Sequence, residues 1–271
     1  MRKWTLFALV TGLALIVSSA QAVGPSTVEV DFYYGNILAG TASIGGGGWT
    51  VQKDGDPWWD NFSADPSGRN IGDVLSSAGD LPSPPGALDY LYGTNTATSV
   101  ADWVFRDSIG SGVLRLELAG WANINQLGIY KAGSTSPSDR ITLFSGPDSP
   151  SKQVTFSIPA SWGGRFGLFI TSQVGTFYSE ASLNPSDTQP DPNDPHKNRP
   201  YQHFALFKGG FNQYGFVRWW IGVEDKNWAI NGPGQGNEHN NNNSNRGDYQ
   251  DMVLTIEAVP DASTLALFLS G

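Results

Sequence analysis

Glycine and proline interrupt this chain so often that no long helix fits between them. The 33 Gly and 17 Pro residues separate apolar or alternating stretches of only five to nine residues. Short stretches of this kind, bounded by turn-forming residues, predict β-strands. Nine can be identified, at residues 27–34, 112–118, 125–130, 140–144, 153–158, 165–171, 202–207, 215–223 and 251–258. We therefore expect an all-β fold, a single antiparallel β-sandwich of jelly-roll-like type with long polar loops.

The first 22 residues have the composition of a secretion signal. Arg2 and Lys3 precede an apolar run over residues 4–17, and small residues follow up to Ala22. This order of basic, apolar and small residues is read by the export machinery and its peptidase. The apolar run falls short of the roughly 20 residues that a membrane-spanning helix needs. We expect cleavage after Ala22 and a protein that is secreted or held at the cell surface.

Residues 23–258 are expected to form one domain, because their number suits a single large sandwich. Without Arg2 and Lys3, 14 basic residues stand against 25 acidic ones, and no basic stripe is present. Nucleic acid is therefore not an expected partner. The chain has no Cys, which excludes thiolate metal sites and cysteine catalysis. Residues 186–200 and 231–246 are interpreted as long surface loops, with a domain boundary at 186–200 as the alternative.

Three segments near the end of the chain together resemble a class of secreted bacterial proteins. They are Trp220–Lys226 (WIGVEDK), Gly247–Val253 (GDYQDMV) and Val259–Thr264 (VPDAST). A GVED strand, a Gly/Asn loop and a DYxDMV strand directly before a sorting tail are similar to the PEP-CTERM class. The resemblance extends from Leu116 to the end. It implies an extracellular protein, often found with exopolysaccharide, whose tail is cleaved by an exosortase-type sorting enzyme.

The sorting motif implied by this resemblance comprises Val259, Pro260, Asp261, Ser263 and Thr264. It is a VPD-type variant of the usual Pro-Glu-Pro sequence. The apolar run that follows reaches residue 271 without a closing basic cluster. Its seven residues make only about 10 Å of helix, a third of the hydrocarbon core. We therefore expect residues 259–271 to be a truncated exosortase-type sorting tail.

Four acidic residues are predicted to meet at one edge of a sheet. Glu224 and Asp225 end one expected strand, while Asp248 and Asp251 begin the next. If these strands are neighbours, the four carboxylates converge, and hard oxygen ligands are what Ca²⁺ requires. A structural Ca²⁺ ion is the expected cofactor. The class motif often has an acid at the position of Arg246, so one ligand is replaced here by a positive charge.

The alternative for these acids is a solvated surface on which they cap turns and pair with Lys226 and Arg246. Arg246, Gly247 and Asp248 also spell a cell-adhesion tripeptide, which we interpret as a chance match.

Trp58 and Trp59 are the candidate ligand-binding residues. Most of the ten tryptophans are expected to fill a core that lacks disulfides, because each buries a large area. Adjacent residues on a strand face opposite ways, and Asp and Pro nearby indicate a turn. At least one of the two rings is therefore expected to be exposed, where a sugar ring could stack on it.

Catalytic residues are not expected. The acids that could form a glycosidase pair show no spacing that singles out two of them; they are Asp54, Asp56, Asp60, Glu180, Glu224 and Asp225. No His-Glu-x-x-His or Gly-x-Ser-x-Gly sequence is present, which removes two common catalytic arrangements. His203, inside an apolar stretch, is expected to be a hydrogen-bonded core residue rather than a base.

The sequence as a whole predicts a secreted, matrix-associated β-sandwich that binds or organises exopolysaccharide. Two alternatives stay open: a sandwich-fold enzyme acting on glycans, and a purely structural matrix protein.

Overall fold

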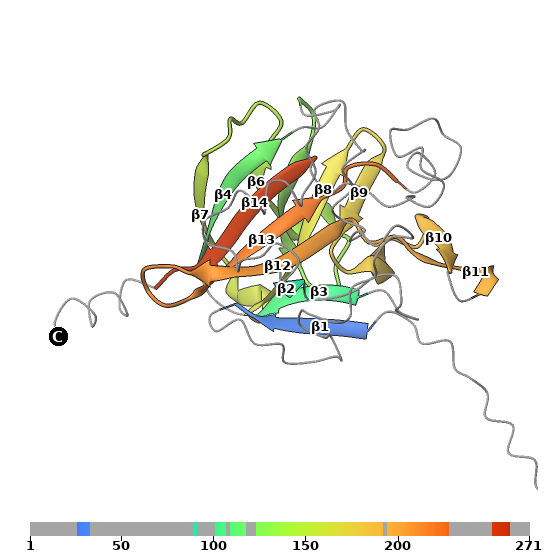
Figure 1. Ribbon diagram of the computed structural model, residues 1–271, viewed down its shortest axis with the longest axis horizontal. Coiled ribbons are helices and arrows are strands. Elements are labelled where there is room, and N and C mark those ends of the chain that lie inside the picture. Colours follow the sequence, from blue (N-terminus) through green and yellow to red (C-terminus); the bar gives the residue numbers. More distant parts are fainter. Residues whose placement is uncertain are drawn as a thin grey trace, which may run out of the picture.

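The computed structural model describes residues 26–32, 89–90, 101–106, 109–117, 123–191, 194–227 and 251–260. These residues form two large β-sheets and one small hairpin (Figure 1). The all-β class expected from the sequence is confirmed. Helical structure within the described part is limited to short 3-10 turns, η2 (Pro137–Asp139), η3 (Ala160–Trp162) and η4 (Ala181–Leu183). No helix in these ranges has the length and apolar character needed to cross a membrane.

The first sheet has the order β1-β3-β8-β5-β6, with β9 also paired to β8. β1 and β3 are parallel, and the other described pairs in this sheet are antiparallel. The antiparallel pairing expected from the sequence thus holds for the other described pairs of this sheet, and β1 departs from it at the edge. The strands are β1 (Ser26–Asp31), β3 (Ala101–Arg106), β5 (Gln126–Lys131), β6 (Arg140–Ser145), β8 (Arg165–Ser172) and β9 (Gly175–Tyr178).

The second sheet has the order β2-β12-β13-β14-β4-β7 and is antiparallel throughout. Its strands are β2 (Asp89–Tyr90), β4 (Ile109–Glu117), β7 (Gln153–Ser157), β12 (Phe204–Phe211), β13 (Val217–Val223) and β14 (Met252–Ala258). Each of the nine stretches predicted from the sequence corresponds to a strand in one of the two large sheets. The central strands β12, β13 and β14 lie side by side in Figure 1.

One aromatic-rich core joins the two sheets. The rings of Phe105 and Phe166 stack at 5.3 Å in the first sheet, and Phe105 meets Trp219 of the second sheet edge-on at 6.4 Å. Trp162 and Trp220 are also buried. Large aromatic side chains bury about 150–250 Å² each, so they supply much of the core of a chain without disulfides. The expectation that tryptophans fill the core is confirmed for Trp162 and Trp219, whereas Trp220 is buried outside this cluster.

The proline-rich segment is more regular than its sequence indicated. β10 (Thr188–Asp191) and β11 (Asp194–Pro200) pair as an antiparallel hairpin, with an irregular register at Pro190. The segment 186–200, interpreted from the sequence as a long surface loop, therefore contains a β-hairpin. The residue before a proline is driven towards extended backbone, and extended backbone is compatible with an edge hairpin. The other expected loop, 231–246, lies outside the described residues.

Candidate metal site

The register between β13 and β14 brings acidic residues from both strands to one edge. Gly222 pairs with Val253, so continuing the ladder by two residues places Glu224 opposite Asp251. On its other side, Glu224 continues the ladder to β12, where its N–H donates to the carbonyl of His203 at 3.0 Å. The edge of the second sheet thus positions Glu224 and Asp225 beside Asp251, as the sequence predicted.

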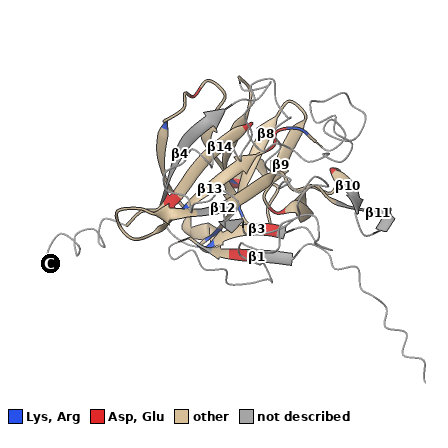
Figure 2. Cartoon of the chain, viewed as in Figure 1, with Lys and Arg blue, Asp and Glu red and all other residues tan. Residues whose placement is uncertain are grey.

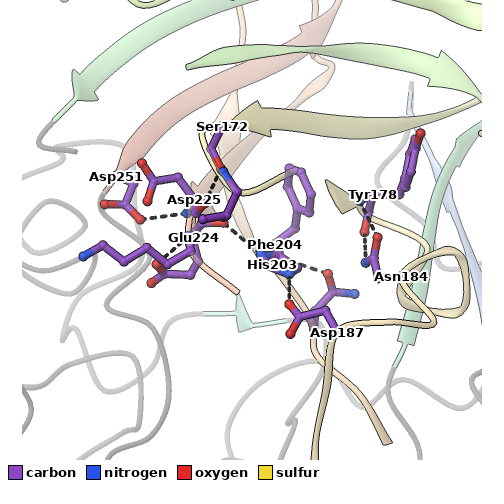
Figure 3. A network of polar contacts seen from close by, with 12 residues as sticks. Ser172, Tyr178, Asn184, Asp187, His203, Phe204, Glu224, Asp225 and Asp251 are labelled. Carbon is purple, nitrogen blue, oxygen red and sulfur yellow. Dashed lines mark hydrogen bonds and ion pairs between the residues drawn. The ribbon is translucent and has the colours of Figure 1, made fainter. Parts of the chain in front are cut away.

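The three carboxylates form a tight and buried group, which we call the acid cluster: Glu224, Asp225 and Asp251 (Figure 3). One oxygen from each lies within 4.8 Å of the others. The residues are exposed by only 2%, 0% and 6%. The alternative of a solvated acidic surface therefore does not hold for these three residues.

Backbone N–H groups hold the carboxylates in place. The N–H of Asp225 donates to Oδ2 of Asp251 at 2.8 Å. The N–H of Lys226 donates to Oε1 of Glu224 at 3.3 Å. Ser172, at the end of β8, donates its hydroxyl to the carbonyl of Asp225 at 2.6 Å. The cluster is therefore built into the turn after β13 and anchored to the opposite sheet.

Two buried oxygens at the acid cluster have no hydrogen-bond donor within the described structure. Oδ2 of Asp225 accepts from Nδ2 of Asn125 at 2.8 Å, whereas Oδ1 of Asp225 has no partner. Oδ1 of Asn125 also has no partner. Both residues are completely buried. Buried polar atoms are nearly always satisfied, and each exception requires an explanation, such as a bound ion.

A divalent cation would satisfy these oxygens and balance the charge. Like charges about 4 Å apart repel by about 4 kcal/mol at an effective dielectric constant of 20, so three buried carboxylates are costly without compensation. Oxygens on opposite sides of a Ca²⁺ ion are about 4.8 Å apart, since Ca–O distances are about 2.4 Å. The cluster oxygens all lie within 4.8 Å of one another, so one ion of this size can contact all three carboxylates.

The other sequence-predicted site residues are described only in part. Asp248 and the pair Trp58 and Trp59 lie outside the described residues, so their roles stay predictions. Of the sorting motif, Val259 and Pro260 follow β14, and the N–H of Val259 donates to the carbonyl of Ile109 at 2.9 Å. The rest of the motif, Asp261, Ser263 and Thr264, lies outside the described ranges.

Asn125 was not among the predicted site residues. It immediately precedes β5 in the first sheet, 100 residues before Asp225 in the chain. The only sequence signal was an amide residue directly before an apolar strand, which is too common to single it out.

A second buried group lies behind Glu224. His203 is completely buried, and its ring stacks on Phe177 at 3.8 Å and 9°. Nδ1 is 3.0 Å from the carbonyl of Glu224, and Nε2 is 2.7 Å from Oδ2 of Asp187 (Figure 3). Because a carbonyl only accepts, Nδ1 is the donor to Glu224, and the other ring nitrogen is hydrogen-bonded to Asp187. The expectation of a hydrogen-bonded core histidine is confirmed.

A third polar group joins β3 to the segment after β9. Asp102 accepts from both N and Oγ of Ser182, at 2.9 and 2.7 Å. Glu180 forms a β-bridge with Asp102, and its Oε1 accepts from the hydroxyl of Tyr130 at 2.8 Å and the N–H of Gly133 at 2.7 Å. Acidic positions on β1 and β3 are visible in Figure 2. Each carboxyl group is thus held by its own pair of donors.

Burial raises the pKa of both Asp102 and Glu180, and the negative charge of Asp102 raises that of Glu180 further. Burial and the charge of Glu180 also raise the pKa of the Tyr130 hydroxyl well above its usual value. These groups are therefore harder to ionise in the folded protein than in the unfolded chain.

This difference predicts a pH-dependent effect of Glu180→Gln. A carboxyl group with a raised folded-state pKa binds protons more readily when folded, so its contribution to stability increases as the pH falls through that pKa towards the unfolded value near 4.5. Relative to the unsubstituted protein, Glu180→Gln should therefore be more favourable at pH 7 than at pH 4. Urea unfolding in the presence of a chelator measures both differences. Equal differences at the two pH values would contradict the prediction.

No family model and no curated protein sequence matches this chain. Among solved structures, it is similar to the C-terminal domain of the BC2L-C lectin from Burkholderia cenocepacia, with 14% identity, a TM-score of 0.28, and coverage of 56% of this chain and 91% of the lectin domain. The Chromobacterium violaceum lectin CV2L, in complex with alpha-methyl-fucoside, has 10% identity, a TM-score of 0.27, and coverage of 56% and 87%. Both TM-scores are far below 0.5, so neither a ligand nor a site is transferred from these lectins.

Proposed function

We propose that this chain is an exported, non-catalytic β-sandwich protein that binds Ca²⁺ at the acid cluster and, in that form, binds or organises extracellular polysaccharide. The observation that carries the proposal is the burial of Glu224, Asp225 and Asp251 together with an Asp225 oxygen that has no donor. A bound cation explains that arrangement directly. Asp248 is proposed as a further ligand from the sequence.

Export and the polysaccharide rest on the sequence. The N-terminal signal, the PEP-CTERM resemblance and the expected sorting motif point to a protein outside the cell, with an exosortase-type enzyme as its processing partner. Trp58 and Trp59 are the proposed stacking residues, because at least one of the two rings is expected from the sequence to be exposed, and an aromatic ring supplies a large contact area. Calcium is abundant outside cells, and extracellular modules bind it with dissociation constants of about 10⁻⁴–10⁻³ M.

Retention on polysaccharide tests this function. The secreted protein is passed over immobilised alginate, xanthan, dextran and cellulose, in millimolar Ca²⁺ and again in chelator. We expect retention on at least one polysaccharide in Ca²⁺, with loss of retention in chelator and in Asp225→Asn. Release of reducing ends from any of them would instead identify a glycan-active enzyme. Neither retention nor release would favour a purely structural matrix protein.

A further inference from the structure

We propose that the side-chain oxygen of Asn125 is a ligand of the same ion, so that one Ca²⁺ ties the first sheet to the second. This inference rests on the proposed function, because it requires a cation at the acid cluster. It adds a ligand from the opposite sheet, and it assigns the ion a mechanical role.

Asn125 is already in contact with the acid cluster. Its Nδ2 lies 2.8 Å from Oδ2 of Asp225, so its amide oxygen, on the same planar group, also lies close to the carboxylates. That oxygen has no donor in the described structure, and the residue is completely buried. An unsatisfied and buried oxygen beside three carboxylates is a position at which a cation gains a ligand.

The amide can serve the cluster in two orientations. In the structure, the amide N–H donates to Oδ2 of Asp225. This orientation is favourable when no cation is bound, because a carboxylate accepts a hydrogen bond from an N–H group. A half-turn about the terminal torsion exchanges nitrogen and oxygen. With a cation among the carboxylates, the oxygen is the atom that can coordinate it. Asn125 therefore remains bonded to the cluster in both orientations.

The position of Asn125 links the ion to the frame of the first sheet. Its carbonyl accepts the N–H of Gly146 at 2.7 Å, directly after β6. Ser172, at the end of β8, reaches the carbonyl of Asp225 close by. Two contacts between the sheets thus converge on Asp225. An ion held by both sheets would oppose their local separation, because opening the structure at this point would also break the contacts to the ion.

Calcium titration of Asn125 variants tests the assignment. In Asn125→Ala, we expect Ca²⁺ affinity measured by calorimetry to fall by about tenfold or more, as when a metal site loses a supporting group. Asn125→Asp should bind Ca²⁺ at least as tightly as the unsubstituted protein, because a carboxylate oxygen replaces the amide oxygen. Without Ca²⁺, Asn125→Asp should be less stable than the unsubstituted protein, because it adds a fourth buried carboxylate. Asn212→Ala is the matched control: it removes another buried asparagine, whose Nδ2 donates to the carbonyl of Ala258 at the opposite end of β14 from Asp251, and it should leave the affinity unchanged.

Amide hydrogen exchange tests separately whether the ion links the two sheets. Ca²⁺ should slow exchange at Asp225, whose N–H is bonded to Asp251, and at Gly146, whose N–H is bonded to Asn125. In Asn125→Ala, the slowing at Gly146 should disappear while that at Asp225 persists. Unchanged Ca²⁺ affinity in Asn125→Ala, or weakened binding in Asn125→Asp, would overturn the Asn125 assignment and leave the acid cluster intact. Failure of the unsubstituted protein to bind Ca²⁺ would overturn both proposals.

Discussion

Millimolar Ca²⁺ should raise the unfolding midpoint of the chelator-treated protein, and Asp225→Asn should abolish most of that rise. An ion at ten times its dissociation constant adds about 1.4 kcal/mol to the free energy of unfolding, which shifts the midpoint of a domain of 150–250 residues by about 3–6 °C at about 2–4 °C per kcal/mol. Asp225 is the best residue to substitute in this test, because it is completely buried and its Oδ1 has no hydrogen-bond donor. Differential scanning calorimetry with and without Ca²⁺ measures the effect.

The effect of Asp225→Asn on the free energy of unfolding should have opposite signs in chelator and in Ca²⁺. In chelator, Asp225→Asn removes one of three mutually repelling carboxylates, so the variant should be at least as stable as the unsubstituted protein. In Ca²⁺ it should be less stable, because a charged ligand is lost. Asp148→Asn is the matched control: Asp148 pairs with Lys152 at the surface, and its loss should leave the Ca²⁺-induced shift unaltered. An equal shift in Asp225→Asn and the unsubstituted protein would contradict a metal site at the cluster.

The acid cluster could be predicted from the sequence because its parts are close in the chain and carried by adjacent strands. Glu224 and Asp225 follow β13, and Asp251 precedes β14, so antiparallel pairing alone brings them together. Asn125 could not be predicted in the same way. It comes from the other sheet, and its approach to Asp225 depends on how the two sheets pack, which no local pattern encodes.

The strands, like the site residues, include some that local sequence predicts and some that it does not. β13 and β14 are apolar stretches bounded by turn-forming residues, and the sequence predicts them. β3 was missed because Asp102 interrupts its apolar residues. Asp102 is tolerated there since Ser182, 80 residues later, satisfies its carboxylate. β9, with four residues, is too short to display a period of two. A distant partner thus decides the structure of β3, whereas β9 was missed because of its length.

The His203–Asp187 pair should have the largest effect on stability of any polar contact described here. Replacing His203 with Phe leaves the buried Asp187 carboxylate without its 2.7 Å partner, and breaking a buried pair by removing one member costs about 3–5 kcal/mol. The change also removes the hydrogen bond from Nδ1 to the Glu224 carbonyl. Urea unfolding in chelator should therefore show a large fall in the free energy of unfolding.

A double-mutant cycle separates the pair from its surroundings. Asp187→Leu should also destabilise strongly, because Nε2 of His203 then lacks its partner inside the core. The double variant His203→Phe with Asp187→Leu should lose less free energy of unfolding than the two single variants lose together, since both members of the pair are then removed. If the loss in the double variant equals the sum of the two single losses, the two side chains are not coupled. Strong coupling, with Ca²⁺ binding retained in the double variant, would establish that the pair stabilises the fold behind Glu224 and is not itself needed to bind the ion.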